Sequence, residues 1–156
     1  MRDVAIVGVS MLKFGRYPEK QVPELGAQAV LLALNDAGIT LKEVEIMVSG
    51  NLYQANATVG QRILKEIGQT GIPVVNVSNA CATGSTAFRE AYMSVASGAY
   101  DMALAVGSEQ MGKMGLLGMG GGRGEVSPEG IVGSGLMPAV FGQAGVEHMR
   151  KYGTTM

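Results

Sequence analysis

The chain has 156 residues, of which 47% are hydrophobic and 16% charged, and its formal net charge is −1. This length is enough for one domain with a sizeable core, and the near-balanced charge argues against nucleic-acid binding by bulk electrostatics. One cysteine cannot form an internal disulfide, and the sequence shows no signal peptide and no apolar run of membrane-spanning length. We therefore expect a cytoplasmic protein without a membrane span.

Four short apolar runs predict β-strands. They are nearly continuous in their hydrophobicity, which is typical of strands buried on both faces of a parallel sheet. Helical patterns separate them, so the fold class is α/β with a doubly wound, mostly parallel sheet. The runs are Val4–Val9, Val44–Val48, Val74–Val77 and Met102–Val106.

Three helices are predicted between these strands. The first spans residues 23–37 and ends before Gly38, which suits a left-handed cap. The second spans 58–67, with Thr58 as its N-cap residue. The third follows Cys81 to about residue 97, and its apolar face carries Phe88, Ala91, Tyr92 and Val95.

After residue 111 the sequence becomes rich in glycine and methionine. The run GMGGGRG, Gly118–Gly124, does not match a phosphate-binding motif in register and does not directly follow a strand, so an irregular loop is the simpler interpretation. A helix is predicted again over residues 138–151, with the only histidine, His148, on its apolar face. We interpret His148 as a hydrogen-bonded, part-buried residue and not as a catalytic base.

Cys81 is the candidate catalytic residue. It follows the run Val74–Val77 and begins the third predicted helix, and free N–H groups at a helix start stabilise a thiolate. Small neighbours, Ala80, Ala82, Gly84 and Ser85, would let another group approach. From chemistry alone an inert, buried cysteine remains an equal alternative. Glu109, after the fourth strand, is expected to orient a loop or form a salt bridge, without a catalytic role.

The segment VSNACATGSTA resembles the nucleophile segment of the thiolase superfamily. The start, VAIVGVSMLKFGRYPEK, resembles thiolases of the sterol-carrier-protein-2 type, as do LGAQAVLLALNDAGITLKEVEIMVSGN and YDMALAVGSEQM. The resemblance runs in the family's order from Val4 to Tyr152. It identifies the chain with the amino-terminal part of such a thiolase.

The resemblance implies a thiolase-like half-domain with strand order 3-2-1-4, truncated before a fifth strand. It divides the chain into an α/β core with the nucleophile helix over residues 1–110, and the start of a loop domain over 111–156. It also implies thioester acyl transfer on acyl-CoA through an acylated Cys81. The activating histidine would belong to a second half, so the isolated chain is expected to be inactive or weakly active.

The implied partners are an acyl-CoA substrate, a second copy paired through Val74–Val77, and a chain that supplies the missing half. A coenzyme A thioester enters as substrate, and we expect no cofactor and no metal, since one histidine and one cysteine do not make a zinc site. The alternatives are a ketoacyl-acyl-carrier-protein synthase-like condensing enzyme, a retro-aldolase of the same fold group and a non-catalytic assembly subunit.

Overall fold

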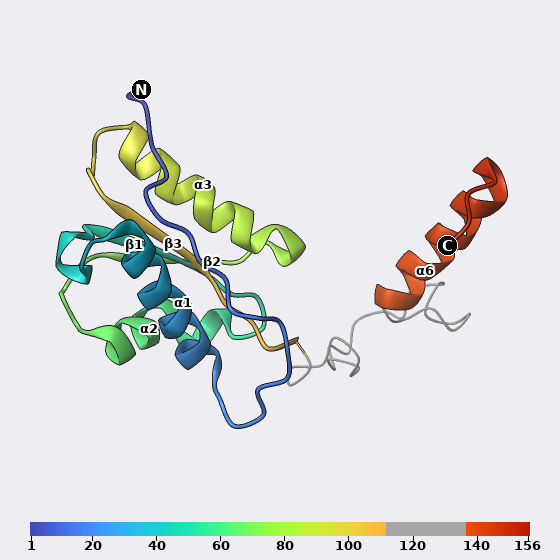
Figure 1. Cartoon of the computed structure of the whole chain (residues 1–156), viewed down its shortest axis with the longest axis horizontal. Helices are drawn as coiled ribbons and strands as arrows, with labels where there is room; N and C mark the ends of the chain where they lie inside the picture. Colours follow the sequence, from blue (N-terminus) through green and yellow to red (C-terminus); the bar gives the residue numbers. More distant parts are fainter. Residues whose placement is uncertain (112–136) are drawn as a thin grey trace. The chain divides into compact units, whose positions relative to one another are not determined.

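The computed structural model describes residues 1–111 and 137–156 (Figure 1). The chain divides into two compact units, Met1–Gln110 and Met111–Met156. The first unit is an α/β domain, and the second is described through one helix. The glycine- and methionine-rich stretch, with its run GMGGGRG, lies outside the described residues.

A three-stranded parallel sheet forms the centre of the first unit. Its order is β2 (Val74–Val77), β1 (Ile46–Gly50), β3 (Ala103–Gly107). Met47 is in register with Val74 on one side and with Leu104 on the other. All five residues of β1 are buried, as expected for the central strand of a parallel sheet.

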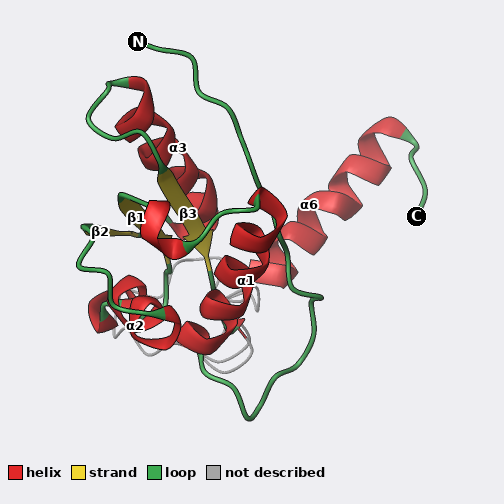
Figure 2. Cartoon of the chain, turned by 60° about the vertical axis from the view of Figure 1, so that its left-hand side comes forward, coloured by secondary structure: helices red, strands yellow, loops and turns green. Residues whose placement is uncertain are grey.

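Helices cover both faces of this sheet (Figure 2). α1 (Val22–Ala37) and α2 (Val59–Ile67) pack on one face, and α3 (Thr83–Ala96) packs on the other. Short 3₁₀ turns precede or follow the strands at Leu41–Glu43, Ala55–Ala57 and Ala80–Ala82. The predicted α/β class is therefore confirmed.

Two apolar clusters hold these layers together. The larger lies between the sheet and α1 and α2, and its buried members are Val22, Ala27, Val30, Leu34, Val44, Met47, Val59, Ile63, Leu64 and Val106. The smaller lies under α3 and consists of Val48, Ala87 and Ala91. The small residues of α3 let that helix approach the sheet closely.

The ends of α1 agree with the sequence pattern. Its first turn is closed by Glu24, whose Oε2 accepts the N–H of Gln21 at 2.7 Å. It ends at Gly38, which adopts φ 70°, a left-handed conformation that costs glycine little.

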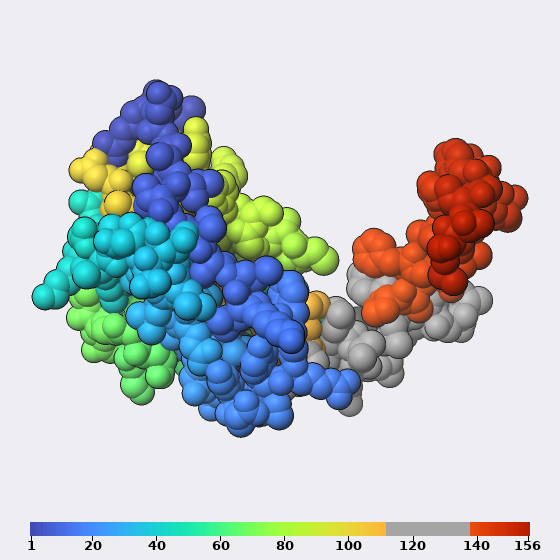
Figure 3. Space-filling model, viewed as in Figure 1, coloured from blue at the N-terminus to red at the C-terminus, as the bar shows by residue number. Residues whose placement is uncertain are grey.

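The run Val4–Val9 is not a strand, which corrects the prediction made from its hydrophobicity. It passes over α1 as an irregular segment, where the N–H of Val9 donates to Oδ2 of Asp36 at 2.8 Å. Arg2 anchors its start through its backbone N–H to the carbonyl of Ala96. The segment lies on the surface of the first unit, in dark blue in Figure 3.

The expected strand order 3-2-1-4, which numbers the four predicted strands along the chain, is also corrected, because the first of them is not in the sheet. β1 pairs directly with β3 as well as with β2, so both of its ladders are already occupied. No place remains in this sheet for Val4–Val9 between them. Ile6, Val7 and Val9 consequently stay 55–67% exposed.

Thr58 does not cap α2, contrary to prediction. It takes φ 49°, ψ 51° and makes no side-chain cap hydrogen bond. An N-cap hydroxyl reaches the first N–H groups of a helix from extended backbone, and a left-handed residue directs it elsewhere. The predicted end of the helix at Gly68 is confirmed.

The covered face of α3 also differs from the predicted one. Thr83, Ala87, Ala91 and Ala96 are buried, whereas Phe88 and Tyr92 are 51% and 40% exposed. The two aromatic rings therefore form an uncovered apolar strip along α3 in the first unit.

Helix α6 (Met137–Tyr152) occupies the second unit, where a helix was predicted. His148 is exposed and not part-buried, which corrects that expectation, but it is hydrogen-bonded: its Nδ1 lies 3.1 Å from Oγ1 of Thr154. Its ring packs against Tyr152 at 4.8 Å between centroids. Within residues 1–111 and 137–156, no helix is long and apolar enough to cross a membrane.

Candidate active site

Cys81 lies where strand β2 passes into helix α3. It occupies the middle of the 3₁₀ turn Ala80–Ala82, two residues before the regular helix begins at Thr83. This is the carboxyl-end edge of the parallel sheet, where α/β proteins commonly bind ligands. The side chain is exposed in the first unit, so the alternative of a buried, inert thiol does not describe this structure.

Thr83 fixes the turn that carries Cys81. Its Oγ1 accepts the N–H of Asn79 at 2.8 Å and donates to the carbonyl of Ala80 at 2.7 Å. Thr86 adds a second link, because its Oγ1 accepts from Nδ2 of Asn79 at 3.0 Å. These hydroxyls hold the backbone on both sides of the thiol, so its position is set by short local bonds.

Ala80, immediately before Cys81, has φ 45°. This left-handed conformation is strained for a residue with a Cβ and costs about 1–2 kcal/mol. Apart from glycines, only Ala80 and Thr58 have positive φ among the described residues. Strained backbone of this kind gathers at functional sites, and here it immediately precedes the exposed Cys81.

The surroundings of Cys81 are open, as the small residues suggested. Ala80, Ala82, Gly84 and Ser85 are all exposed. A Cβ built on Gly84 would meet nothing within 4 Å. Within the first unit as the structure describes it, another molecule can therefore approach the thiol directly.

Glu109 holds the loop that follows β1. Its Oε2 accepts the N–H groups of Leu52 and Tyr53, both at 3.0 Å. Of the two roles expected for Glu109, the structure gives it the orientation of a loop. Asn51 supports the same loop, since its Oδ1 accepts the N–H of Gln54 at 2.6 Å and its Nδ2 donates to the carbonyl of Ser108 at 2.7 Å.

Gln110 extends this network to the segment before α1. Its Nε2 donates to the carbonyls of Tyr17 and Lys20, at 3.1 and 2.8 Å. The loops after β1 and β3 and the approach to α1 are thereby tied together at the same edge of the sheet as Cys81.

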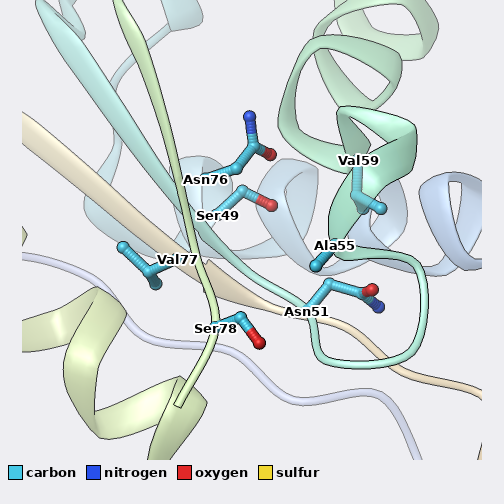
Figure 4. Close-up of a pocket in the computed structure, with 7 residues that line it drawn as sticks. All are labelled: Ser49, Asn51, Ala55, Val59, Asn76, Val77 and Ser78. Atoms are coloured by element: carbon cyan, nitrogen blue, oxygen red, sulfur yellow. The ribbon is translucent and has the colours of Figure 1, made fainter.

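A small cavity opens at this edge between β1, β2 and the start of α2 (Figure 4). Its volume is about 40 Å³, and it is lined by Ser49, Asn51, Ala55, Val59, Asn76, Val77 and Ser78. Sequence reasoning missed these residues. The available signal was polar residues at the ends of apolar runs: Ser49 and Asn51 follow one predicted strand, and Asn76 interrupts another.

His148, which was not expected to be catalytic, belongs to the second unit, and Cys81 belongs to the first. Near His148, the hydrogen bond from Arg150 lowers the pKa of the exposed Glu147 carboxyl. Among the described residues, no group of three or more histidine, cysteine, aspartate or glutamate side chains could hold a metal ion.

Comparison with curated proteins finds relatives that are longer than this chain. Sterol carrier protein 2 of Gallus gallus is 40% identical over 165 residues, which cover 98% of this chain and 30% of that protein. Sterol carrier protein 2 of Homo sapiens is 38% identical, over 99% of this chain and 30% of that protein. An acetyl-CoA acetyltransferase of Methanocaldococcus jannaschii is 41% identical over 71% of this chain and 29% of its own length. The chain thus spans about a third of these relatives.

Among solved structures, the 3-oxoacyl-[acyl-carrier-protein] synthase III from Aquifex aeolicus VF5 shares the fold. The TM-score is 0.57 at 18% identity, over 61% of this chain and 32% of that one. At this identity the likeness establishes the fold and nothing further. Finally, residues 4–129 match the family model of the thiolase N-terminal domain. The chain therefore belongs to the thiolase family and corresponds to its amino-terminal part.

Proposed function

We propose that this chain carries the nucleophile of a thioester acyl transferase that acts on acyl-CoA. The thiolate of Cys81 attacks the thioester carbonyl, a new carbon–sulfur bond forms, and the bond to coenzyme A breaks. The electron pair leaves with the coenzyme A sulfur, which takes up a proton. The product is an acylated Cys81, from which a second substrate can then take the acyl group.

The observation that carries this proposal is the exposed Cys81 at the entry to α3, after a strained Ala80. Its backbone N–H at the helix start would help to hold the oxyanion that develops on the carbonyl. Membership of the thiolase family and a relative named acetyl-CoA acetyltransferase support the choice of acyl-CoA.

A nucleophile of this kind also needs a general base. His148 lies in the second unit, and the chain spans about a third of its relatives' length. We propose that the base comes from a part that corresponds to the portion of the relatives not matched by this chain. The isolated chain should then be acylated slowly and should catalyse few rounds of acyl transfer. The alternatives remain a ketoacyl-acyl-carrier-protein synthase-like enzyme, whose donor is a carrier protein, and a non-catalytic assembly subunit.

The test is to incubate the chain with acetyl-CoA and to locate any acetyl adduct by intact-mass and peptide mass spectrometry. We expect one adduct, on Cys81, and none on Cys81→Ser. In parallel, iodoacetamide should label Cys81 faster than it labels free cysteine at neutral pH. An acetylated carrier protein serves as a second donor: acylation from it alone would favour the synthase-like alternative. Labelling no faster than free cysteine, with no adduct from either donor, would leave the assembly role.

A further inference from the structure

The cavity at the end of β1 contains a buried hydroxyl without a partner. Ser49 is 1% exposed, and its Oγ has no hydrogen-bond partner among the described residues. Figure 4 shows this hydroxyl directed away from the strand, into the space between β1 and α2. A buried hydroxyl without a hydrogen-bond partner is destabilising, and native structures leave few of them. Because Ser49 also lines the cavity, its hydroxyl is free to donate to a group bound there.

The start of α2 forms the opposite wall and presents hydrogen-bond donors. Val59, the first residue of the helix, lines the cavity, and its backbone N–H takes part in none of the hydrogen bonds found among the described residues. Thr58 leaves it uncapped because its backbone is left-handed. A helix start with free N–H groups carries partial positive charge and favours an anion.

The two side-chain amide oxygens around the cavity are already in use. Oδ1 of Asn51 accepts the N–H of Gln54, and Oδ1 of Asn76 accepts the N–H of Gly60 at 2.8 Å. Among the described residues, no ionised side chain lines the cavity. The donors that remain are the hydroxyls of Ser49 and Ser78 and the backbone N–H of Val59.

We propose that this cavity binds a small carboxylate, of the size of formate or acetate, with the Ser49 hydroxyl as its buried donor. The volume of about 40 Å³ admits a group of that size and excludes a nucleotide or an extended acyl chain. The site is separate from the Cys81 thiol, which does not line it, and it does not depend on acyl transfer.

The experiment titrates the ¹⁵N-labelled chain with sodium formate and sodium acetate at constant ionic strength, with sodium chloride as the reference salt. We expect saturable shifts of the amide signals of Ser49 and Val59 that chloride does not reproduce. Ser49→Ala should weaken binding about tenfold or more, because a hydrogen bond to a charged group contributes ~1.5–3 kcal/mol.

Ser108→Ala is the matched control. Ser108 Oγ is also buried without a partner, but Ser108 does not line the cavity, so its variant should bind as the parent does. Ala55→Leu offers a second variant if Ser49→Ala folds poorly. Ala55 is an exposed wall residue, and a larger side chain should block the cavity while Ser49 is retained.

Three results would overturn the proposal. Shifts that chloride reproduces indicate a general salt effect, and no shifts with either carboxylate indicate that water alone fills the cavity. Equal affinity in the parent chain and in Ala55→Leu would place the anion elsewhere.

Discussion

Asn76 on β2 caps the first turn of α2: its Oδ1 accepts the backbone N–H of Gly60 at 2.8 Å. A strand side chain thus replaces the N-cap that Thr58 does not provide. The contact demands a residue without a side chain at position 60. A Cβ there would lie 2.5 Å from Cγ1 of Val74 and 2.8 Å from Cβ of Ser49.

Gly60→Ala should therefore destabilise the first unit. Overpacking at a close helix–strand contact costs about 1–3 kcal/mol, although alanine favours a helix over glycine by about 1 kcal/mol. Urea unfolding followed by circular dichroism measures the change. Gly84→Ala is the control, since its Cβ meets nothing within 4 Å and it should stabilise slightly. Equal effects of the two variants would contradict the proposed packing.

Glu109→Ala should loosen the loop after β1. The carboxylate is the acceptor for the N–H groups of Leu52 and Tyr53, and hydrogen bonds to a charged group contribute about 1.5–3 kcal/mol. Hydrogen exchange resolved by residue should show faster exchange at these two amides, by about tenfold or more. In Glu109→Gln, which keeps one carbonyl acceptor, the exchange rates of these amides should fall between those of the parent chain and of Glu109→Ala. Unchanged protection in Glu109→Ala would remove Glu109 from this role.

We predict that the chain pairs with a second copy through the open edge of β2, where Val75 is 42% exposed. The N–H of Met47 donates to the carbonyl of Pro73, and that of Asn51 to the carbonyl of Val77. Alternate residues of a parallel strand face the same neighbour, so the N–H of Val75 faces β1 while that of Val74 faces outwards.

This geometry gives a matched pair of variants. Val74→Pro removes an outward donor at the first residue of the strand, a position that tolerates proline, and should weaken the dimer while the fold persists. Val75→Pro removes an internal donor and should disrupt β2 itself. Sedimentation velocity and circular dichroism separate the two effects. A parent chain that is monomeric at micromolar concentration would refute the pairing.

Gly8→Ala should release the amino-terminal segment from α1. A Cβ on Gly8 would lie 2.6 Å from the carbonyl oxygen of Ala33 and 2.7 Å from Cβ of Ala37. The bond from the N–H of Val9 to Asp36 should then be lost, and hydrogen exchange at Val9 should approach that of a free chain. Gly15→Ala makes only ordinary contacts and should leave Val9 protected. Protection of Val9 in both variants would show that the segment tolerates a Cβ.

The stability of the carboxyl end of helix α6 should depend on pH. The hydrogen bond from Arg150 lowers the pKa of Glu147 below its usual 4.5. A carboxyl with a lowered folded-state pKa adds stability above the unfolded-state value, and this is lost as pH falls through the folded-state value. Backbone NMR shifts near Glu147 should show less helix in acid, and Glu147→Gln should abolish that dependence. An equal acid response in Glu147→Gln would assign it to another group.

The sequence predicted the elements whose signals are local. α1 has proline in its first turn and a left-handed glycine at its end, and the runs at 44–48, 74–77 and 102–106 are apolar and short. The run at 4–9 has the same composition but no strand to pair with, because β3 already occupies that side of β1. The hydrophobicity of a run indicates that it tends to be buried, but it does not indicate which strand the run pairs with.

The candidate site divides in the same way. Cys81 and Glu109 could be predicted because each lies shortly after a predicted strand. The cavity could not, because Ser49, Val59 and Asn76 meet only after the β1–α2–β2 crossover has folded. The hydrogen bond from Gly60 to Asn76 also depends on this crossover. Thr58 was predicted as the N-cap because its residue type and its position next to the helix are all that the local sequence shows.

The central strand acquires its two neighbours at very different moments of synthesis. Ile46 of β1 must wait for Ala103 before its second ladder can close, and the intervening chain includes α2, β2 and α3. A ribosome adds about 5–20 residues each second, so several seconds separate the synthesis of β1 from that of β3, and at least one edge of β1 stays open during this time. Parallel pairings between distant segments also form slowly once the chain is complete. β1 therefore keeps an unpaired apolar edge until β3 has been made, and an unpaired strand edge is a site at which chains can associate.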